Sequence, residues 1–329
     1  MSFSGYKNII EEGDTVILYF NREVAFFAQV KTGDLFSCRF GSYKHEDMIG
    51  QPFGLKLTSH TGRGFVYLLH PTPELWTLVV PHRTQIIYTA DIAFISTYLD
   101  LKPGVKVIES GTGSGSFSHS IARTIGQTGH LYTFEYHLER SELARAEFLL
   151  HGLQDGVTVQ NRDVCKDGFG LDNEVDAVFL DLPAPWEAVE SAKKAIKKNT
   201  TGRICTFSPC IEQVQRSCAA LAENGFTEIC TFECLTRGYE SKSVAMPTLD
   251  QAIRNLKTKV LKRKADKSQA YGQKRDKDVN GSENDSPEED SLVPVKSVNS
   301  LPVSKPVLDL RGHTSYLTFA VLPPVFFEN

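Results

Sequence analysis

The feature that most constrains the fold is a regular alternation of short apolar runs with longer amphipathic stretches from residue 105 to residue 235. Strands that alternate with helices form βαβ crossovers, so the sequence predicts an α/β domain with a mostly parallel, doubly wound sheet. The predicted strands are 105–109, 131–135, 157–161, 177–181, 203–208 and 226–235. The predicted helices are 117–125, 138–151, 186–197 and 211–224.

Residues 14–70 follow another pattern, in which short apolar or alternating runs are separated by turn residues. Several short strands at such spacing predict a small barrel or a compact sandwich. Pro71-Thr72-Pro73 is a plausible joint, after which 74–78 and 85–99 are predicted to be helical. The predicted strands of the small unit are 15–20, 24–30, 35–40, 55–58 and 65–69.

A charged segment interrupts the α/β pattern near the C-terminus. Between Arg254 and Lys277 ten Lys or Arg stand against two Asp, and Glu283–Asp290 contains five acids. Low hydrophobicity with blocks of one charge predicts disorder, and the basic run 257–267 fits a nuclear localisation signal, an RNA-contacting tail or a plain linker. The β run at 315–321 predicts a last sheet strand. The predicted parts are therefore 1–73, β-rich; 74–249, α/β; 250–306, a disordered insertion; and 307–329, the strand that completes the sheet.

The composition excludes some classes of function. Lysine and arginine number 36 against 40 aspartate and glutamate, for a net charge of −4, so a nucleic-acid surface must be local rather than a general basic excess. Seven cysteines are scattered and the first residues lack a secretory leader, from which we expect a reducing, intracellular compartment. No apolar run is long enough to predict a membrane span. The cysteine spacings also predict buried thiols rather than a metal site.

A glycine-rich turn links the first predicted strand of the α/β domain to the helix after it, in the sequence Glu109-Ser110-Gly111-Thr112-Gly113-Ser114-Gly115-Ser116. Glycines permit positive φ and let a ligand lie against the backbone, although a tight turn without a ligand is the alternative. The spacing is G-x-G-x-G after an acid, whereas dinucleotide-binding turns have G-x-G-x-x-G. The pattern is similar to the first motif of Rossmann-like methyltransferases, and an acid beside the turn suits the cationic sulfonium of S-adenosylmethionine, so we favour that cofactor over NAD.

The next two strands also end in polar residues. Glu135 follows Gly115 by twenty residues and can accept hydrogen bonds from both hydroxyls of a ribose, unless it is only a solvated acid. Asp163 can hold an adenine amino group while Val164 packs on the ring. Because parallel strands end at one edge of the sheet, these groups are predicted to share one ligand site.

The fourth strand ends in Asp181-Leu182-Pro183-Ala184-Pro185-Trp186. The prolines fix an irregular loop that would present Asp181 beside the cofactor, with Trp186 as a platform for a flat base. The loop resembles the one with which nucleic-acid amino-group methyltransferases hold a target base. The alternative is that Asp181 caps the next helix.

With these motifs located, the chain resembles the catalytic subunits of eukaryotic tRNA (adenine-N1)-methyltransferases, which modify position 58 in the T-loop. The resemblance lies in 70–77, 81–88, 109–116, 181–186, 208–215 and 313–319 and spans nearly everything except 236–310. It implies a Rossmann-like class I methyltransferase domain behind an N-terminal β-barrel-like domain. It also implies S-adenosylmethionine as cofactor, tRNA as substrate, a related non-catalytic subunit in a heterotetramer with two copies of each, and a location in the nucleus or also the cytoplasm. T-loop-like sites in mRNA are a further substrate class left open.

The resemblance also implies roles for individual residues. Asp181 would be catalytic, stabilising the positive charge that methylation places on the base. The cofactor would contact Gln85, Glu109, Ser110, Gly111, Thr112, Gly113, Ser114, Gly115, Ser116, Glu135, Arg140, Asp163, Val164 and Asp181. The RNA would contact Arg83, Thr206, Phe207, Ser208 and Tyr316.

Two other functions compete with this interpretation. One is a non-catalytic scaffold that binds RNA, although such a protein would be free to lose the glycine turn, Glu135 and Asp181. The other is a methyltransferase that acts on an exocyclic amine or a protein, which the proline loop alone does not exclude.

Overall fold

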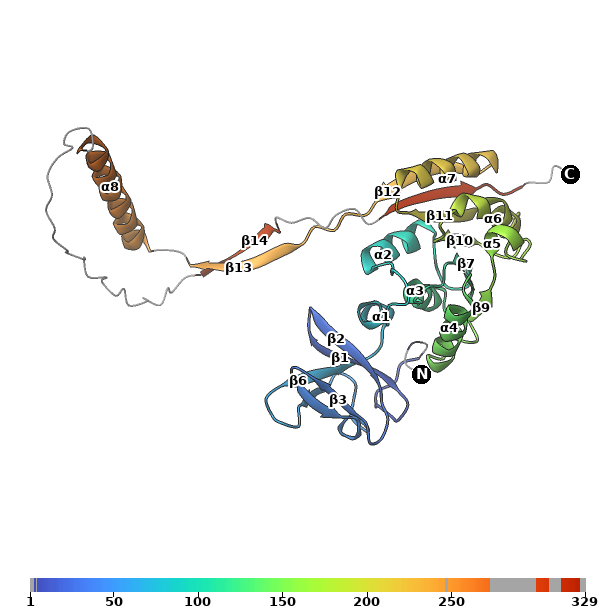
Figure 1. The fold of residues 1–329 in the computed structure, drawn as a ribbon, viewed down its shortest axis with the longest axis horizontal. Coiled ribbons are helices and arrows are strands. Elements are labelled where there is room, and N and C mark those ends of the chain that lie inside the picture. Colours follow the sequence, from blue (N-terminus) through green and yellow to red (C-terminus); the bar gives the residue numbers. More distant parts are fainter. Residues whose placement is uncertain (1–2, 4, 246–247, 273–299, 308–314, 326–329) are drawn as a thin grey trace, which may run out of the picture. The chain divides into compact units, whose positions relative to one another are not determined.

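We describe the protein from a computed structural model, in which residues 3, 5–245, 248–272, 300–307 and 315–325 are described. The chain divides into two compact units (Figure 1). The first comprises Met1–Leu235 together with Gly312–Asn329, and the second is Thr236–Arg311. The predicted joint at Pro71-Thr72-Pro73 does not separate units, because Trp76 packs against Phe27 with ring centroids 5.0 Å apart.

A seven-stranded sheet forms the centre of the first unit, in the order β12-β15-β11-β10-β7-β8-β9. Strands β7 to β11 pair in parallel, whereas β15 lies antiparallel between β11 and β12. The mostly parallel α/β fold is thereby confirmed. The strands are β7 (Lys106–Ser110), β8 (His130–Glu135), β9 (Val157–Asn161), β10 (Ala177–Leu180), β11 (Gly202–Ser208), β12 (Thr227–Glu233) and β15 (Tyr316–Leu322).

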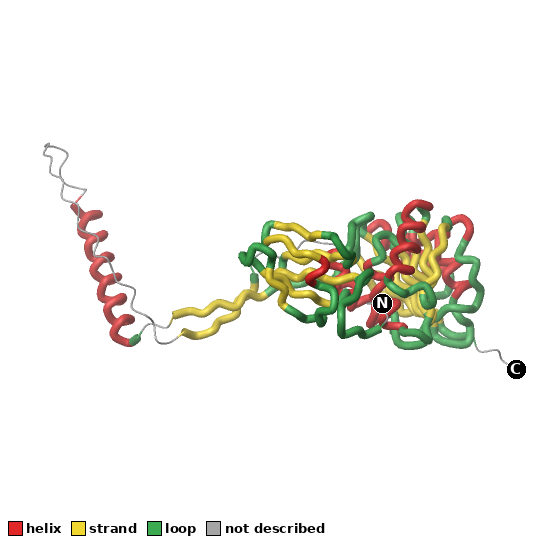
Figure 2. Tube along the Cα trace, turned by 90° about the horizontal axis from the view of Figure 1, so that it is seen from below, coloured by secondary structure: helices red, strands yellow, loops and turns green. Residues whose placement is uncertain are grey.

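Helices cover both faces of this sheet (Figures 1 and 2). Apolar residues of α1 to α4 share one buried cluster with the sheet, and those of α5 to α7 share another. The helix predicted over 85–99 begins only at Thr89, because the chain before it is extended at Tyr88. The helices are α1 (Pro73–Val79), α2 (Thr89–Tyr98), α3 (Ser116–Ile125), α4 (Leu138–Leu150), α5 (Val164–Asp167), α6 (Val189–Ala195) and α7 (Ile211–Glu223), with a 3₁₀ turn, η2 (Pro185–Ala188), before α6.

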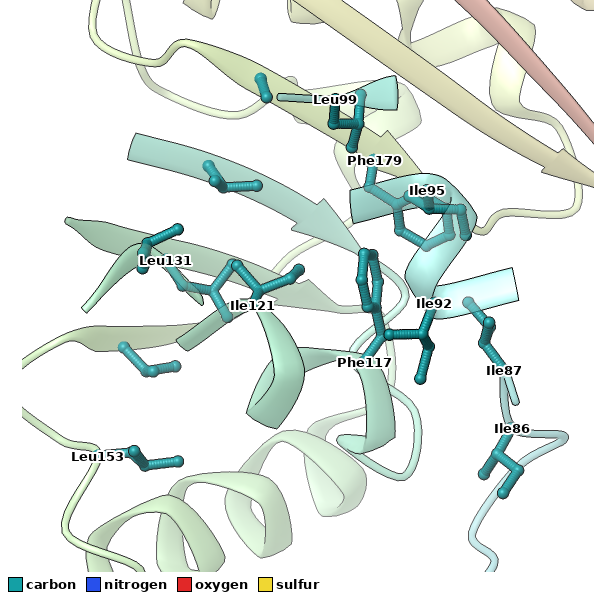
Figure 3. Close-up of a cluster of buried hydrophobic side chains, with 14 of the residues drawn as sticks. Ile86, Ile87, Ile92, Ile95, Leu99, Phe117, Ile121, Leu131, Leu153 and Phe179 are labelled. Carbon is teal, nitrogen blue, oxygen red and sulfur yellow. The ribbon is translucent and has the colours of Figure 1, made fainter. Parts of the chain in front are cut away.

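The first cluster fixes α3 on the sheet (Figure 3). Phe117 and Ile121 of α3 are buried against Phe179 of β10 and Leu131 of β8. The rings of Phe117 and Phe179 meet edge to face with centroids 4.9 Å apart. Buried aromatic pairs of this kind stabilise by burial and by ring geometry. The start of α3, which follows the glycine-rich turn, is therefore held in a defined place.

The N-terminal part contains two small antiparallel sheets around one core. One sheet has the order β2-β1-β6-β5, and β3 with β4 forms a separate hairpin. The backbone N–H of His60, just after β5, donates to the carbonyl of Ser42 on β4 at 2.9 Å, which joins the two sheets around one buried cluster. The elements are β1 (Thr15–Asn21), β2 (Val24–Gln29), β3 (Leu35–Cys38), β4 (Gly41–Lys44), the 3₁₀ turn η1 (His45–Asp47), β5 (Lys56–Thr58) and β6 (Phe65–Leu69).

The second unit contains a hairpin and a helix. Strands β13 (Tyr239–Ala245) and β14 (Ser300–Pro306) pair antiparallel, from Tyr239↔Pro306 to Ala245↔Ser300, and helix α8 spans Leu249–Gly272. The prediction of disorder over 250–306 is therefore wrong for 250–272 and 300–306, and 273–299 lie outside the described residues. Lys, Arg, Leu, Ala and Gln are strong helix formers, a local preference that the charge argument overlooked. Within the described residues, no helix is both long and apolar enough to span a membrane.

Candidate functional site

A cavity of about 640 Å³ opens at the carboxyl ends of β7, β8, β9 and β10. This is the edge at which open α/β sheets bind ligands. Its lining includes every residue predicted to contact the cofactor, namely Gln85, Glu109, Ser110, Gly111, Thr112, Gly113, Ser114, Gly115, Ser116, Glu135, Arg140, Asp163, Val164 and Asp181. Residues not predicted include Thr84, Ile86, Phe134, Tyr136, His137 and Cys165. Five of the six, all but His137, directly adjoin a predicted residue in the sequence, so adjacency was the signal that could have found them.

The glycine-rich turn needs its glycines for two reasons. Gly111, Gly113 and Gly115 have φ of +97°, +53° and +75°, a region that other residues rarely adopt. In addition, a Cβ on Gly111 would lie 2.4 Å from the carbonyl oxygen of Asp181, and one on Gly113 would lie 2.6 Å from Thr84 Oγ1. The turn therefore needs glycine both for its positive φ angles and for its close packing against neighbouring residues.

Glu135 is buried at the end of β8 and its carboxylate is fixed by three groups. Oε2 accepts a hydrogen bond from the backbone N–H of Gly113 at 3.0 Å. Oε1 accepts from the backbone N–H of His137 at 3.1 Å and from Arg140 Nη2 at 2.7 Å. Oε1 also accepts from Arg140 Nε at 3.0 Å, whereas Oε2 accepts only the bond from Gly113, so Oε2 has a second lone pair with which Glu135 can accept from a ligand. Arg140 contacts Glu135 as well as lining the cavity, which orients the carboxylate.

Glu109 and Asp181 make this end of the cavity acidic. Burial raises the pKa of Glu109 to about 7, against the opposing effect of hydrogen bonds from Ser118 and Thr133. Burial also raises the pKa of Asp181 to about 7, and the charge of Glu135 adds to the shift. Three carboxylates around one cavity repel one another, so a cation bound there would be stabilised and would favour their ionised forms.

Asp181 stands at the start of the proline loop. Its backbone N–H donates to the carbonyl of Ser110 at 2.8 Å, which ties the loop to the start of the glycine-rich turn. The following 3₁₀ turn begins at Pro185 after Ala184, so Asp181 is not its cap and that alternative is wrong. Trp186 does not line the cavity, and Arg216 lies over its ring with the guanidinium carbon 5.1 Å from the centroid. The prediction that Trp186 is a platform for the base is therefore not supported by its position.

The five residues predicted for the RNA do not line the cavity. Thr206 and Ser208 are buried in β11, where Phe207 packs against the core and Ser208 pairs with Tyr316 of β15. Arg83 lies behind the glycine-rich turn, where Nη2 donates to the carbonyl of Ser114 at 3.0 Å. Four of the five therefore lie in the sheet, on β11 and β15, and Arg83 contacts the glycine-rich turn.

This fold and this site define a Rossmann-like class I methyltransferase. Residues 64–322 match the family described as "tRNA methyltransferase complex GCD14 subunit", and the chain belongs to that family.

Relatives extend the similarity over almost the whole chain. The tRNA (adenine(58)-N(1))-methyltransferase catalytic subunit TRM61 of Candida albicans is 42% identical, over 98% of this chain and 99% of that protein. The corresponding subunit trmt61a of Dictyostelium discoideum is 40% identical, over 95% of this chain and 97% of its own length.

Solved structures also share the fold. A SAM-dependent O-methyltransferase of Thermotoga maritima is 25% identical, with a TM-score of 0.70 over 98% of this chain and 97% of that one. The tRNA (m1A58) methyltransferase TrmI of Aquifex aeolicus is 22% identical, with a TM-score of 0.64 over 95% of this chain and 98% of that one.

Proposed function

We propose that this chain is the catalytic subunit that transfers a methyl group from S-adenosylmethionine to N1 of adenosine 58 in the T-loop of tRNA. The observation that carries the proposal is the cavity in which the glycine-rich turn, Glu135 and Asp181 come together. Family membership and two relatives of similar length with this activity in their names support it.

The residues present fit S-adenosylmethionine. The cavity, about 640 Å³, falls within the usual range for small-molecule sites. Glu135 would hold the ribose hydroxyls, Asp163 and Val164 the adenine, and Glu109 with the glycine-rich turn the methionine end. When bound, this cofactor supplies an electrophilic methyl group on a sulfonium cation. The acidity of the cavity suits that positive charge.

Methylation of the base requires no proton transfer by the protein before the attack. Adenine N1 is unprotonated at neutral pH and has a lone pair in the plane of the ring, so no general base is needed. The base must be turned out of its tertiary pairing and aligned, and orientation alone can supply several kcal/mol. Methylation leaves the base cationic, and Asp181, as a carboxylate accepting from the exocyclic amine, would stabilise the developing charge.

A partner subunit is also part of the proposal. An aromatic surface at the β12 edge of the sheet supports it: Tyr98 of α2 is 37% exposed, and its ring centroid lies 5.0 Å from that of Phe232 on β12. Phe94 packs on both rings. Tyrosine and phenylalanine are enriched in protein interfaces. We infer that it binds the related non-catalytic subunit, in a heterotetramer that acts in the nucleus.

Nucleoside analysis tests the proposed function. The chain, co-expressed with its related subunit, is incubated with S-adenosylmethionine and unmodified tRNA, which is then digested to nucleosides. We expect 1-methyladenosine from wild-type tRNA and none from a transcript with uridine at position 58. A methylated exocyclic amine would instead support the second enzyme class, and tRNA binding without any methylated nucleoside would support the scaffold.

A further inference from the structure

A buried polar cluster lies behind the glycine-rich turn, on the side away from the cavity. It consists of Arg83 from the segment before α2, His119 of α3, and Glu147 and His151 at the end of α4. None of the four lines the cavity. Their contacts converge on two consecutive backbone carbonyls of the turn.

The two histidines form a directed chain of hydrogen bonds. His119 Nδ1 lies 2.6 Å from the carbonyl oxygen of Gly115, and His119 Nε2 lies 2.8 Å from His151 Nδ1. A carbonyl only accepts, so His119 Nδ1 carries a proton, Nε2 of the neutral ring accepts, and His151 Nδ1 donates. Burial lowers the pKa of His119 to about 4 and that of His151 to about 3. Both rings are therefore neutral at physiological pH, and the direction of the chain is fixed.

Arg83 holds the preceding peptide. Its Nη2 donates to the carbonyl of Ser114 at 3.0 Å, and its backbone N–H donates to Ser114 Oγ at 2.9 Å. The same Nη2 lies 3.4 Å from Glu147 Oε2, and the side chains of Arg83 and Glu147 are 15% and 14% exposed. Ser114 is thus held at its carbonyl and at its hydroxyl by one residue.

The polar cluster costs stability in comparison with an apolar filling of the same space. Among the described residues, Arg83 Nε and Glu147 Oε1 are buried without a hydrogen-bond partner, and such groups cost stability. Apolar residues of similar volume are often at least as stable as a buried ion pair. The cluster therefore has a role other than stability, and its contacts with the carbonyls of Ser114 and Gly115 indicate that this role concerns the glycine-rich turn.

The geometry is that of hydrogen bonding rather than metal binding. His119, Glu147 and His151 offer donor atoms within 4.8 Å of one another. Nitrogen ligands at about 2.0–2.1 Å from a tetrahedral zinc would lie about 3.3 Å apart. The two histidine nitrogens are 2.8 Å apart, a hydrogen-bond distance.

We propose that Arg83, His119, Glu147 and His151 are positioning residues, which keep the carbonyls of Ser114 and Gly115 turned away from the cavity so that the turn presents its cofactor-binding surface. The inference rests on the proposed binding of S-adenosylmethionine. It also reassigns Arg83 from the RNA to the cofactor turn.

Three variants at two histidines test the chain of hydrogen bonds. His119→Leu removes the side-chain donor to the Gly115 carbonyl, which still accepts from the backbone N–H of residue 119 at 3.2 Å, whereas in His119→Asn the amide nitrogen takes the place of Nδ1. His130→Leu is a control for loss of a histidine elsewhere in the domain, because the half-buried His130 bonds Thr158 at the other end of the sheet. We expect KM and Kd for S-adenosylmethionine to rise about tenfold in His119→Leu and to stay within about threefold in the other two. The kcat at saturating cofactor and the KM for tRNA should stay near wild type in all three.

The outcomes separate the two proposals. If the wild-type complex fails to bind S-adenosylmethionine, the proposed function fails. If wild type binds and a folded His119→Leu binds equally well, or if His119→Asn is as impaired as His119→Leu, the positioning role is overturned. Nitrogen shifts of the two rings give a second measurement, and a tautomer other than the Nδ1–H form would also overturn it.

Arg83→Gln tests the other half of the cluster. Loss of the side-chain bond to the Ser114 carbonyl should raise the KM for S-adenosylmethionine several-fold and leave the KM for tRNA unchanged, while the backbone N–H of residue 83 still donates to Ser114 Oγ. The opposite pattern would return Arg83 to the RNA and remove it from the cluster's role.

Discussion

Two regions of this chain carry dense charge, the cavity at the ends of β7 to β10 and the helix α8, and they carry it in different environments. In the cavity, Glu109 and Glu135 are buried and their oxygens accept hydrogen bonds from groups distant in sequence, such as Thr133 and Gly113. On α8, the charged side chains at 254, 257, 259 and 262 are exposed.

The difference predicts how each region responds to change. A buried charge depends on a few fixed partners, so one substitution leaves other groups unpaired and has a large effect. An exposed charge in solvent is screened, so each contributes little and several act together. The variants below test this contrast, from the largest expected effect to the smallest.

Asp181→Asn should lower the rate of methyl transfer by roughly 10²–10³, the usual effect of removing one preorganised electrostatic group. The amide keeps the shape and can still hydrogen-bond, but it offers no full negative charge to a base that becomes cationic. Single-turnover rates at saturating cofactor, with tRNA and the partner subunit, measure the effect. A rate close to wild type would remove Asp181 from the mechanism.

Gly111→Ala should weaken cofactor binding by about 2–3 kcal/mol and lower the melting temperature, because the new Cβ meets the backbone of Asp181 at 2.4 Å and φ is +97°. Gly126→Ala is the control, since Gly126 also has a positive φ but its Cβ would meet nothing within 4 Å. Calorimetry with both variants separates the strain of φ from the clash. Equal losses in the two would contradict the close approach.

Glu135→Ala should weaken S-adenosylmethionine binding by about 1–3 kcal/mol, because a charged acceptor for the ribose is lost. The backbone N–H of Gly113 also loses its partner. Glu139→Ala, at an exposed position in the first turn of α4, should bind normally. Unchanged affinity in Glu135→Ala would contradict the ribose assignment.

Cofactor affinity should rise with pH between about 6 and 8. Burial raises the pKa of Glu109 and of Asp181 to about 7, so the empty folded protein holds protons that the unfolded chain has released. Its stability therefore falls as pH rises toward 7. A cationic ligand lowers both pKa values, and binding then releases protons.

Calorimetry in buffers of different ionisation enthalpy measures that release. S-adenosylhomocysteine, which lacks the sulfonium charge, should show a smaller pH dependence, and Glu109→Gln should flatten the profile for both ligands. Equal slopes for the two ligands in wild type would show that the carboxylates do not respond to the charge.

The α/β fold and the cavity lining could be predicted because each rests on a short, repeated pattern. The strand ends at Glu109, Glu135 and Asp181 are visible in sequence, and parallel pairing brings them to one edge. The positions of Arg83 and Trp186 could not be predicted. Their partners, Ser114 and Arg216, are about thirty residues away and reach them only through the packing of the folded domain.

The prediction of disorder for the charged segment was wrong for another reason. Composition averages over a window, and the window around 250–306 is polar as a whole. Within it, Ile253, Leu256 and Val260 recur at helical spacing, and Leu301 and Val303 share one face of a strand. Local helix propensity and strand periodicity therefore determine the secondary structure of this segment, and its average polarity hides both.

The smallest effect on the cofactor site is expected from removing α8. Because Ala245 pairs with Ser300 at the end of the β13–β14 hairpin, residues 246–299 can be replaced by Asn-Gly, which suits a two-residue turn. Cofactor affinity should stay at the wild-type value, since the cavity lies wholly within the first unit. If the exposed lysines of α8 contact phosphates, tRNA affinity should fall a few-fold and its dependence on salt should become shallower. Unchanged tRNA affinity with lost nuclear enrichment would instead assign the basic run to localisation, and no change in either would leave a linker. A large loss of cofactor affinity would contradict the expectation that α8 and the cavity act independently.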